Sequence, residues 1–495
     1  MLGLTGILFW FTLREGSMPS AVVTIGLLIQ FAALWLMHMT VEGRWLKHSG
    51  AMLLAMATLY HGFTEIMQWL MPGRNAVRLQ ATQASINTWV LLVSVGLLVY
   101  SAAYSISMHR RPVSASEELR IDSIGGLQIR WLLVMSAPFV LLSVQGRGAL
   151  QAAGFTGSPV VSQNYVTAGL ATQFLVFTLA LTGVVILAKV GGRWLLPWLA
   201  IQTLLLSFVG VRSIMVVGAV LVLYGAIRLN VQLPRKSLVA ALLLLVLIGA
   251  TISSARAVSG RESFLANHTA GDRLAALADG FVALPTAHSR QATVDAFAGR
   301  FDGNTFGALV GAGLDAGRPP VGFATVRNDV LLTVPSFLNP AKLDAPIEQR
   351  NEDAYFVKHF GLHFGTDYLP GLFGFMLGYL GKIGLPVLAA LFGILFAFLD
   401  RWLLRRVNRA RLLISFGLME SVLFYGQLPA GFLLVGRGVL VFVIVVGVAA
   451  LVHSGGRRVR NFGVAGTSSG QSPGESHKDC VPGSSDLDGQ RAFRG

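Results

Sequence analysis

The chain has 495 residues, of which 54% are hydrophobic and only 13% are charged. Soluble globular proteins carry about 25% charged residues, so this composition excludes an ordinary soluble fold and predicts an all-α polytopic membrane protein. The single cysteine, Cys480, excludes a disulfide framework and a cysteine-based metal cluster. The formal net charge of +15 admits a nucleic-acid-binding protein or a membrane protein with basic cytoplasmic loops, and the placement of the basic residues decides between them.

Apolar runs near the bilayer-crossing length of about 20 residues recur along most of the chain. They cover about 21–39, 51–71, 88–106, 131–146, 170–190, 195–211, 214–229, 237–253, 383–399, 412–429 and 438–452. Residues 1–13 form a further apolar run, which is short for a span and lacks the basic start and small-residue cleavage site of a signal peptide. The sequence therefore predicts eleven or twelve transmembrane helices.

The basic residues indicate which connections face the cytoplasm. One set of alternate connections holds Arg44, Lys47, Arg110, Arg111, Arg120, Arg130, Lys189, Arg193, Arg228, Arg235, Lys236, Arg401, Arg405, Arg406, Arg409, Arg411, Arg457, Arg458 and Arg460. The opposite short connections hold only Arg14, Arg74, Arg78, Arg147, Arg212 and Arg437. By the positive-inside rule the first set is cytoplasmic. Basic residues dispersed beside helix ends, without a clustered face or a binding motif, exclude a nucleic-acid partner.

The spans and the polar stretches divide the chain into four regions. Residues 1–253 hold the N-terminal transmembrane helices, and 254–370 form a large loop on the outer, periplasmic face. Residues 371–455 hold the C-terminal transmembrane helices, and 456–495 form a tail rich in Gly, Ser, Asp and Pro. We expect this tail to be disordered on the cytoplasmic side. The loop carries twelve of the 24 acidic residues, and loops this long are usually functional or domains in their own right.

Periodicity within the outer loop predicts local structure. Apolar residues at helical spacing predict a helix over 272–284. A second amphipathic stretch begins near Gln291 and runs toward Phe301, and a helix-like stretch follows Gly303. A turn rich in Gly and Pro is expected at 315–320. The chain then re-enters the membrane through 371–382, where glycines at 371, 374, 378 and 381 favour a short or re-entrant helix that packs closely.

Arginines near the outer surface are the main candidates for binding a substrate. No zinc-protease, phosphate-loop or nucleophile-elbow motif occurs in the sequence, and no metal site is predicted. The outer arginines are Arg212, Arg256, Arg261, Arg300, Arg318, Arg327, Arg350 and Arg437. A planar guanidinium donates two parallel hydrogen bonds to phosphate, so a lipid diphosphate at the outer bilayer surface suits this group. Arg212 and Arg256 rank first because they lie at span ends. The competing interpretation is that most of these arginines pair with the loop's own acids or with lipid headgroups.

Histidines and acids supply the remaining candidates. His359, His363 and Asp367 are spaced by four residues, so on one helix they share a face, and a histidine beside a carboxylate can take a proton from a sugar hydroxyl. A histidine bonded to a backbone carbonyl is the competing interpretation. Glu65, with His61 one turn before it, and Glu420 lie well inside apolar runs. Each should face the helix bundle and find a partner, for which Arg212 and Arg437 are candidates.

Three short patches carry a resemblance to a known family. Gly210-Val211-Arg212-Ser213 resembles the helix-turn arginine of the Wzy-type O-antigen and exopolysaccharide repeat-unit polymerases. The stretch 334–342 resembles their Ile-Pro-Arg-Phe-x-x-Pro-x-Lys segment, with Ser336 where an arginine is common. The stretch 367–385 resembles the end of their loop, where a Gly-containing helix re-enters the membrane. The similarity covers about residues 170–450, and the Arg-x15-Gly repeat of some members is absent.

The resemblance implies a GT-C-like glycosyltransferase of the bacterial inner membrane. Such an enzyme transfers a glycan from undecaprenyl diphosphate onto a new lipid-linked repeat unit, without a metal or another cofactor, because diphosphate is already a good leaving group. His359, His363 or Asp367 is the expected base. The expected substrate contacts are Arg212, Arg256, Arg261, Arg300, Arg327, Lys342 and Arg350. Membrane lipid, a chain-length regulator and a flippase are the implied partners.

Two other functions remain open at this point. An O-antigen ligase, which moves the glycan onto lipid A–core, shares the expected topology and outer loop. A polysaccharide flippase or transporter is a different class. The sequence shows no matching halves with Gly- or Pro-broken helices, and a transporter does not need so long a loop between spans.

Overall fold

The part of the chain that the computed structural model describes is all-helical. It comprises residues 21–70, 78–109, 183, 212–228, 235–259, 270–286, 302–323, 327, 352–362, 371–405, 409–423 and 425. Three of its helices are long and apolar enough to cross a membrane: Ala21–Thr40 (α2), Gln83–His109 (α5), and Gly371–Leu404 within Gly371–Arg405 (α18). An α-helical membrane protein is therefore confirmed as the class. The predicted spans 131–146, 195–211 and 438–452, all of 170–190 except Gly183, and the runs 1–13 and 456–495 lie outside the described residues.

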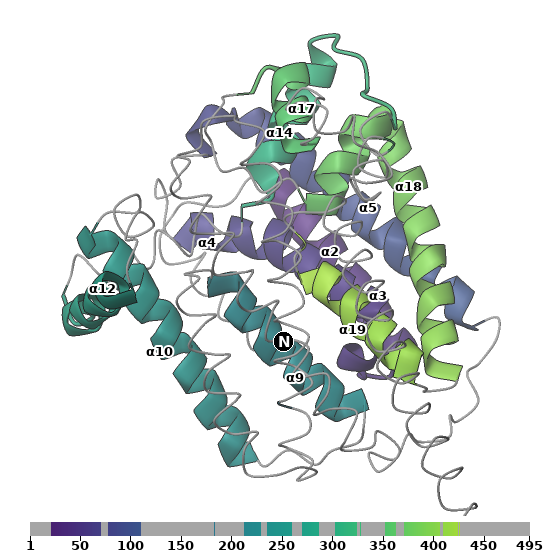
Figure 1. Cartoon of the computed structure of the whole chain (residues 1–495). Helices are drawn as coiled ribbons and strands as arrows, with labels where there is room; N and C mark the ends of the chain where they lie inside the picture. Colours follow the sequence, from purple (N-terminus) through teal and green to yellow (C-terminus); the bar gives the residue numbers. More distant parts are fainter. Residues whose placement is uncertain are drawn as a thin grey trace, which may run out of the picture. The chain divides into compact units, whose positions relative to one another are not determined.

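Other helices match predicted spans and predicted loop elements (Figure 1). Ser49–Thr58 (α3), the π-helical turn Leu59–Phe63 (η2) and Thr64–Leu70 (α4) follow one another over the span predicted at 51–71. Arg212–Arg228 (α9), Arg235–Ser259 (α10) and Arg409–Leu423 (α19) cover three more spans, and Trp45–Lys47 (η1) and Arg78–Gln80 (η3) are single 3-10 turns. In the region of the predicted loop lie Ala270–Ala283 (α12), Asn304–Asp315 (α14) and Glu352–Phe360 (α17). The helices expected at 272–284 and after Gly303 are thus confirmed.

Exposed apolar side chains line one face of several long helices. On α18 the stripe is Ile383, Val387, Leu391, Ile394, Leu395 and Phe398, with Ile383 84% exposed. Spacings of three and four residues place these side chains on one side of the helix. A soluble protein rarely leaves so long an apolar stripe in water, whereas lipid tails cover it at no cost. The exposed face therefore agrees with a membrane environment.

Helix α5 is the centre of the packing, with α2 and α18 along its sides. Three hydrogen bonds join α2 and α5: Gln30 Nε2 to Ser94 Oγ at 3.0 Å, Ser101 Oγ to Ala33 O at 2.8 Å, and Thr40 Oγ1 with Ser105 Oγ at 2.6 Å. Residue numbers rise together along both helices, so α2 and α5 run parallel. The polar pairs fix the register of two otherwise apolar surfaces.

A buried aspartate joins the beginning of α3 to the ends of α5 and α18. Asp400, 2% exposed, accepts hydrogen bonds from the backbone N–H groups of Ser49 (2.9 Å) and Gly50 (3.0 Å). It also accepts from Ser49 Oγ at 2.6 Å and from the Tyr104 hydroxyl at 2.8 Å. The first N–H groups of a helix have no partner within the helix and carry partial positive charge, so the carboxylate satisfies both needs. Helix α3 therefore begins where α5 and α18 end.

Helix α18 is two helices joined at Gly381. This glycine has φ 73° and ψ −169°, a left-handed backbone that breaks the helix. The carbonyl oxygens of Gly378 and Tyr379, at the end of the first part, accept hydrogen bonds from the N–H groups of Val321 and Gly322 at 2.9 and 3.0 Å. The loop turn thus caps the free end of a short helix. The first part of α18 is therefore the short, closely packed helix that the glycine pattern predicts.

Glycines let α14 approach α5 and α18 closely. A Cβ atom added at Gly307 would lie 2.1 Å from Cε2 of Trp89, whereas one at Gly311, one turn later, would meet only Leu377 Cδ2 at 3.8 Å. Gly307→Ala should therefore destabilise the protein by about 1–3 kcal/mol through overpacking. Gly311→Ala, the matched control, should be neutral or stabilising because alanine favours helix. Unfolding curves of both variants in mixed detergent micelles test this, and equal midpoints would contradict the close α14–α5 contact.

Candidate functional site

The candidate site is a buried polar cluster where the 302–305 segment meets the helix bundle. The π-helical turn η2 widens the helix at this point, and such turns are frequent at functional sites. The carbonyl oxygen of Tyr60 accepts a hydrogen bond from the Gly303 N–H at 3.3 Å, and that of His61 accepts one from Asn304 Nδ2 at 2.8 Å. Both acceptors lie in η2. The loop segment is thus bonded directly to the backbone of an apolar helix.

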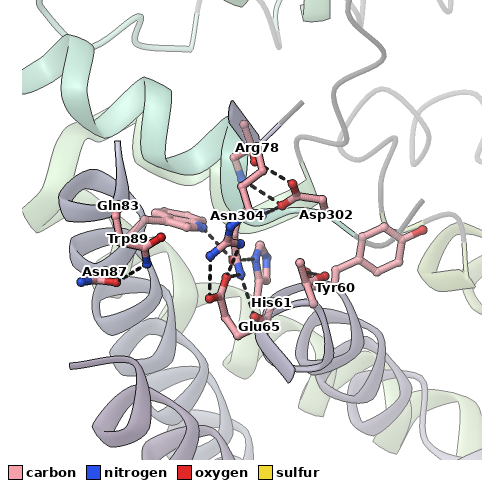
Figure 2. Close-up of polar contacts among 11 residues, drawn as sticks. Tyr60, His61, Glu65, Arg78, Gln83, Asn87, Trp89, Asp302 and Asn304 are labelled. Carbon is pink, nitrogen blue, oxygen red and sulfur yellow. Dashed lines mark hydrogen bonds and ion pairs between the residues drawn. The ribbon is translucent and has the colours of Figure 1, made fainter. Parts of the chain in front are cut away.

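Asn304 is the centre of this cluster, as Figure 2 shows. Its Oδ1 atom lies 2.9 Å from His61 Nδ1 and 3.2 Å from Trp89 Nε1, which donates to it. Its Nδ2 atom donates to the His61 carbonyl and, at 2.7 Å, to Glu65 Oε1. All four bonding positions of the amide are therefore used, and a flipped amide would lose them. Because Oδ1 can only accept, His61 Nδ1 carries the proton of the neutral ring.

His61 sits in an aromatic box and is completely buried. Its ring centroid lies 5.6 Å from that of Trp89, 5.8 Å from Tyr425 and 6.5 Å from Phe373, all nearly edge-on. With the proton on Nδ1, the Nε2 atom accepts from the Tyr425 hydroxyl at 3.0 Å. Through its two nitrogens the imidazole therefore joins α14 to Tyr425, while α5 contacts the ring through Trp89.

A buried ion pair completes the cluster. Arg78 donates from Nη1 to Glu65 Oε1 at 2.7 Å and from Nη2 to Glu65 Oε2 at 2.8 Å, in the bidentate geometry that suits a guanidinium and a carboxylate. The two side chains are only 12% and 4% exposed. Burial alone lowers the pKa of Arg78, but its hydrogen bonds to Glu65 and the charges of Glu65 and Asp302 outweigh burial, so the pKa lies above its already high ordinary value. The Arg78 guanidinium is therefore charged at every physiological pH.

Asp302 holds the beginning of α14 in place. Its Oδ1 atom accepts from the N–H groups of Asn304 and Thr305 at 3.0 and 3.1 Å, and its Oδ2 atom accepts from Thr305 Oγ1 at 2.6 Å. An acidic side chain at this place satisfies the free N–H groups of the first turn and suits the positive end of the helix. Asp302 therefore sets the orientation from which Asn304 reaches into the bundle.

The arrangement places a neutral imidazole, a phenol and an ion pair in a water-poor environment. Ionisable groups among apolar helices are costly and mark functional or structurally decisive positions. Here they come from η2, α4, η3, the residues that lead into α14, and Tyr425, while α5 contributes the indole of Trp89. The cluster can hold the loop segment rigidly and carries charge and proton-binding groups at one end of the bundle. Among the described residues, no group of three or more His, Cys, Asp or Glu side chains could hold a metal ion.

His359 lies outside this cluster, in α17. The Nε2 atom of His359 donates to the carbonyl oxygen of Pro319 at 2.8 Å, and the carbonyl oxygen of His359 accepts from Arg318 Nη1 at 2.6 Å. The ring stacks on Tyr355, with centroids 6.0 Å apart and planes at 9°. This bond to a backbone carbonyl is the one that the competing interpretation of His359 expects. Because Nε2 donates, Nδ1 is the nitrogen of the neutral ring that carries no proton. Helix α17 ends at Phe360 and Gly361 has φ 61°, so His359 and His363 do not share a continuous helix.

The other sequence-predicted residues are described only in part. Arg212 is the first residue of α9, Arg256 lies half-buried in the last turns of α10, and Arg327 is exposed. The remaining candidates lie outside the described residues: Arg261, Arg300, Lys342, Arg350, His363 and Asp367.

The buried acids were predicted to face the bundle, and both do. Glu65 has Arg78 as its partner, rather than Arg212 or Arg437, because the chain turns back after α4 and places η3 beside it. Glu420 is completely buried, and neither carboxyl oxygen has a hydrogen-bond partner among the described residues. Asn304 and Tyr425 belong to the cluster without having been predicted, since no spacing in the sequence relates them to His61.

Comparison of the chain with protein families, with curated proteins and with solved structures finds no match in any of the three. The function therefore has to be argued from the residues and their arrangement.

Proposed function

We propose that the protein is a metal-independent membrane glycosyltransferase that polymerises undecaprenyl-diphosphate-linked oligosaccharide repeat units at the outer face of the bacterial inner membrane. The observation that carries the proposal is the buried cluster of His61, Glu65, Arg78 and Asn304, which fastens the 302–305 segment to an apolar helix bundle. A polymerase joining two lipid-linked glycans needs a polar loop held rigidly at the end of membrane helices. Charges buried this deeply are retained only where they serve structure or function.

The direction of the helices supports an outer location for the loop. Asp400 joins the beginning of α3 to the ends of α5 and α18. Lys47 lies just before α3, and Arg401 and Arg405 follow Asp400 at the end of α18. Clustered basic residues favour the cytoplasmic side. The polar cluster uses the opposite ends of these helices, near the first turns of α5 and the last turns of α3–α4. We therefore propose a periplasmic site.

In the proposed reaction, an acceptor sugar hydroxyl attacks the anomeric carbon of the donor glycan. The bond between that carbon and the diphosphate oxygen breaks, and its electron pair leaves with undecaprenyl diphosphate. The hydroxyl proton passes to a base, for which His359, His363 and Asp367 are the proposed residues. Arg212 and Arg256, at helix ends, stabilise the charge on the leaving diphosphate, with Arg300 and Lys342 as secondary contacts.

A deletion strain distinguishes this activity from its alternatives. Loss of the gene should reduce surface polymer to single repeat units, and the full chain supplied in trans should restore long polymer. Long polymer retained on the lipid carrier would instead identify a ligase. Absence of every exported repeat would identify a flippase. The readout is the banding pattern of surface glycan and of the undecaprenyl-linked pool.

Arg212→Ala and Arg256→Ala should abolish chain extension in the complemented deletion strain. Each removes a guanidinium that we expect to bind diphosphate, and one lost charge-stabilising donor costs about 100- to 1,000-fold in rate. Arg44→Ala is the matched control, because Arg44 is exposed on a basic connection and, in the part of the chain that the structure describes, forms an ion pair with exposed Glu42. Protein level in the membrane is measured alongside. Normal chain length in both outer variants would refute the diphosphate-binding assignment.

A further inference from the structure

Helix α12 packs on α10 through small residues. Ala276 and Gly280, one turn apart, are buried, and a Cβ atom at Gly280 would lie 2.6 Å from both the Cβ and the backbone nitrogen of Ala255. Ser254 and Ala255 on α10 are completely buried. Only glycine, whose side chain is a single hydrogen atom, allows α12 to approach α10 this closely. Figure 1 shows α12 beside the end of α10.

The covered part of α10 continues its exposed apolar stripe. The stripe consists of Val239, Leu243, Val246 and Leu247, which are 44–64% exposed. Steps of three and four residues lead from Leu247 through Ala250 to Ser254, so Ser254 is on the same face of the helix. With this stripe toward lipid, α12 lies on the lipid-facing side of α10 at Ser254, and the exposed stripe resumes one turn later at Val258, which is 52% exposed.

The free side of α12 is itself apolar. Phe281 is 55% and Val282 76% exposed, and Ala275 and Ala278 are exposed with them. At 100° per residue these four side chains occupy one arc, and the exposed acids Asp272 and Asp279 lie together at its border. The helix therefore has three sides, one against α10, one acidic and one apolar. Such a pattern is typical of helices that lie in a membrane interface.

We propose that α12 lies in the interface of the bilayer, with Phe281 and Val282 among the lipid acyl chains and Asp272 and Asp279 toward water. Lipid is the occupant that the geometry favours, because α12 packs on the side of α10 that carries the exposed apolar stripe and its own apolar side faces away from α10. Because the border of its apolar side is acidic, α12 does not bind the bilayer through attraction to anionic headgroups. Attachment to α10 replaces that attraction, since a tethered helix is always at the surface. The proposal requires only a membrane protein, not the glycosyltransferase activity.

Spin labelling of the full chain in lipid vesicles tests the proposal, and the single native cysteine makes it practical. In a Cys480→Ser background, labels are placed by Phe281→Cys, Val282→Cys and, as references, Leu243→Cys on the stripe and Asp279→Cys on the acidic border. Labels at positions 281 and 282 should be more accessible to oxygen than to a water-soluble nickel chelate, as at 243, and the label at 279 should show the reverse. The pattern should be the same in neutral and in partly anionic vesicles.

Two results would overturn the proposal that α12 lies in the bilayer interface. A label at 282 as accessible to the chelate as the one at 279 would place this face in water. A label immobilised and closed to both reagents would mean that protein, another loop segment or a second copy, covers it. Elution of each variant as the same species as the parent on gel filtration shows that α12 is measured in folded protein.

Discussion

Arg78→Met is expected to lower the free energy of unfolding by about 3–5 kcal/mol. Methionine keeps the volume of the aliphatic stem but removes the two hydrogen bonds that Arg78 donates to the buried Glu65 carboxylate, which is 4% exposed and keeps only the bond from Asn304 Nδ2 among those described. A buried charge without a partner is among the most costly defects in a protein. The measurement is reversible unfolding in mixed micelles of increasing SDS fraction, followed by tryptophan fluorescence.

Two controls isolate the ion pair. Adding Glu65→Gln to Arg78→Met should recover part of the loss, because a neutral amide is cheaper to bury than a carboxylate. Arg44→Met should change stability by at most about 1 kcal/mol, since the Arg44–Glu42 pair is 63% and 73% exposed and solvent screens it. If Arg78→Met and Arg44→Met had the same effect, the buried pair would not be what holds η3 to α4.

Asn304→Ala should lower the free energy of unfolding about as much as Arg78→Met does, and it should also release the loop segment that holds residue 304. The substitution leaves the His61 Nδ1 proton, the Trp89 N–H and the His61 carbonyl without their partner, and each such buried group costs about 1–3 kcal/mol. Because the same amide fastens α14 to η2, limited proteolysis within the region around residue 304 should accelerate. Under the proposed function, surface polymer should shorten in the complemented deletion strain.

Asn304→Asp separates the two roles of the amide. The new carboxylate can still accept from His61 and Trp89, but it sets an oxygen against Glu65 Oε1, where Nδ2 now donates at 2.7 Å. Asn304→Asp alone should therefore destabilise strongly, and combining it with Glu65→Gln should restore part of the stability by returning a donor to that contact. A double variant no more stable than either single variant would show that the two side chains are not coupled as the structure indicates.

Helix formation was largely predictable from local sequence. Apolar runs long enough to cross a bilayer coincide with α2, α5 and α18, and the spacing in 272–284 corresponds to α12. The glycines between 371 and 381 predicted a short, tightly packed helix, and Gly381 breaks α18. These features follow from hydrophobicity, periodicity and the conformational freedom of glycine, which act within a few residues.

The candidate site was only partly predictable. Glu65 and His61 stood out because ionisable groups in an apolar run need partners, but their partners come from distant segments: Asn304 lies 243 residues from His61 and Tyr425 lies 364 residues away. His359 was expected to share a helix face with His363, yet Gly361 ends α17 before that position. Helix termination at a single glycine depends on the turn that follows as much as on the helix.

By itself the sequence determined that the described part of this protein is helical and suited to a membrane, because apolar length and charge placement are properties of each segment alone. The tertiary structure decided which polar groups meet. In the tertiary structure Glu65 pairs with the guanidinium of Arg78, Asn304 fixes the tautomer of His61, and Asp400 accepts hydrogen bonds from the beginning of α3. Buried polar groups must be satisfied, but any compatible donor or acceptor serves, and only the packing of whole helices selects one.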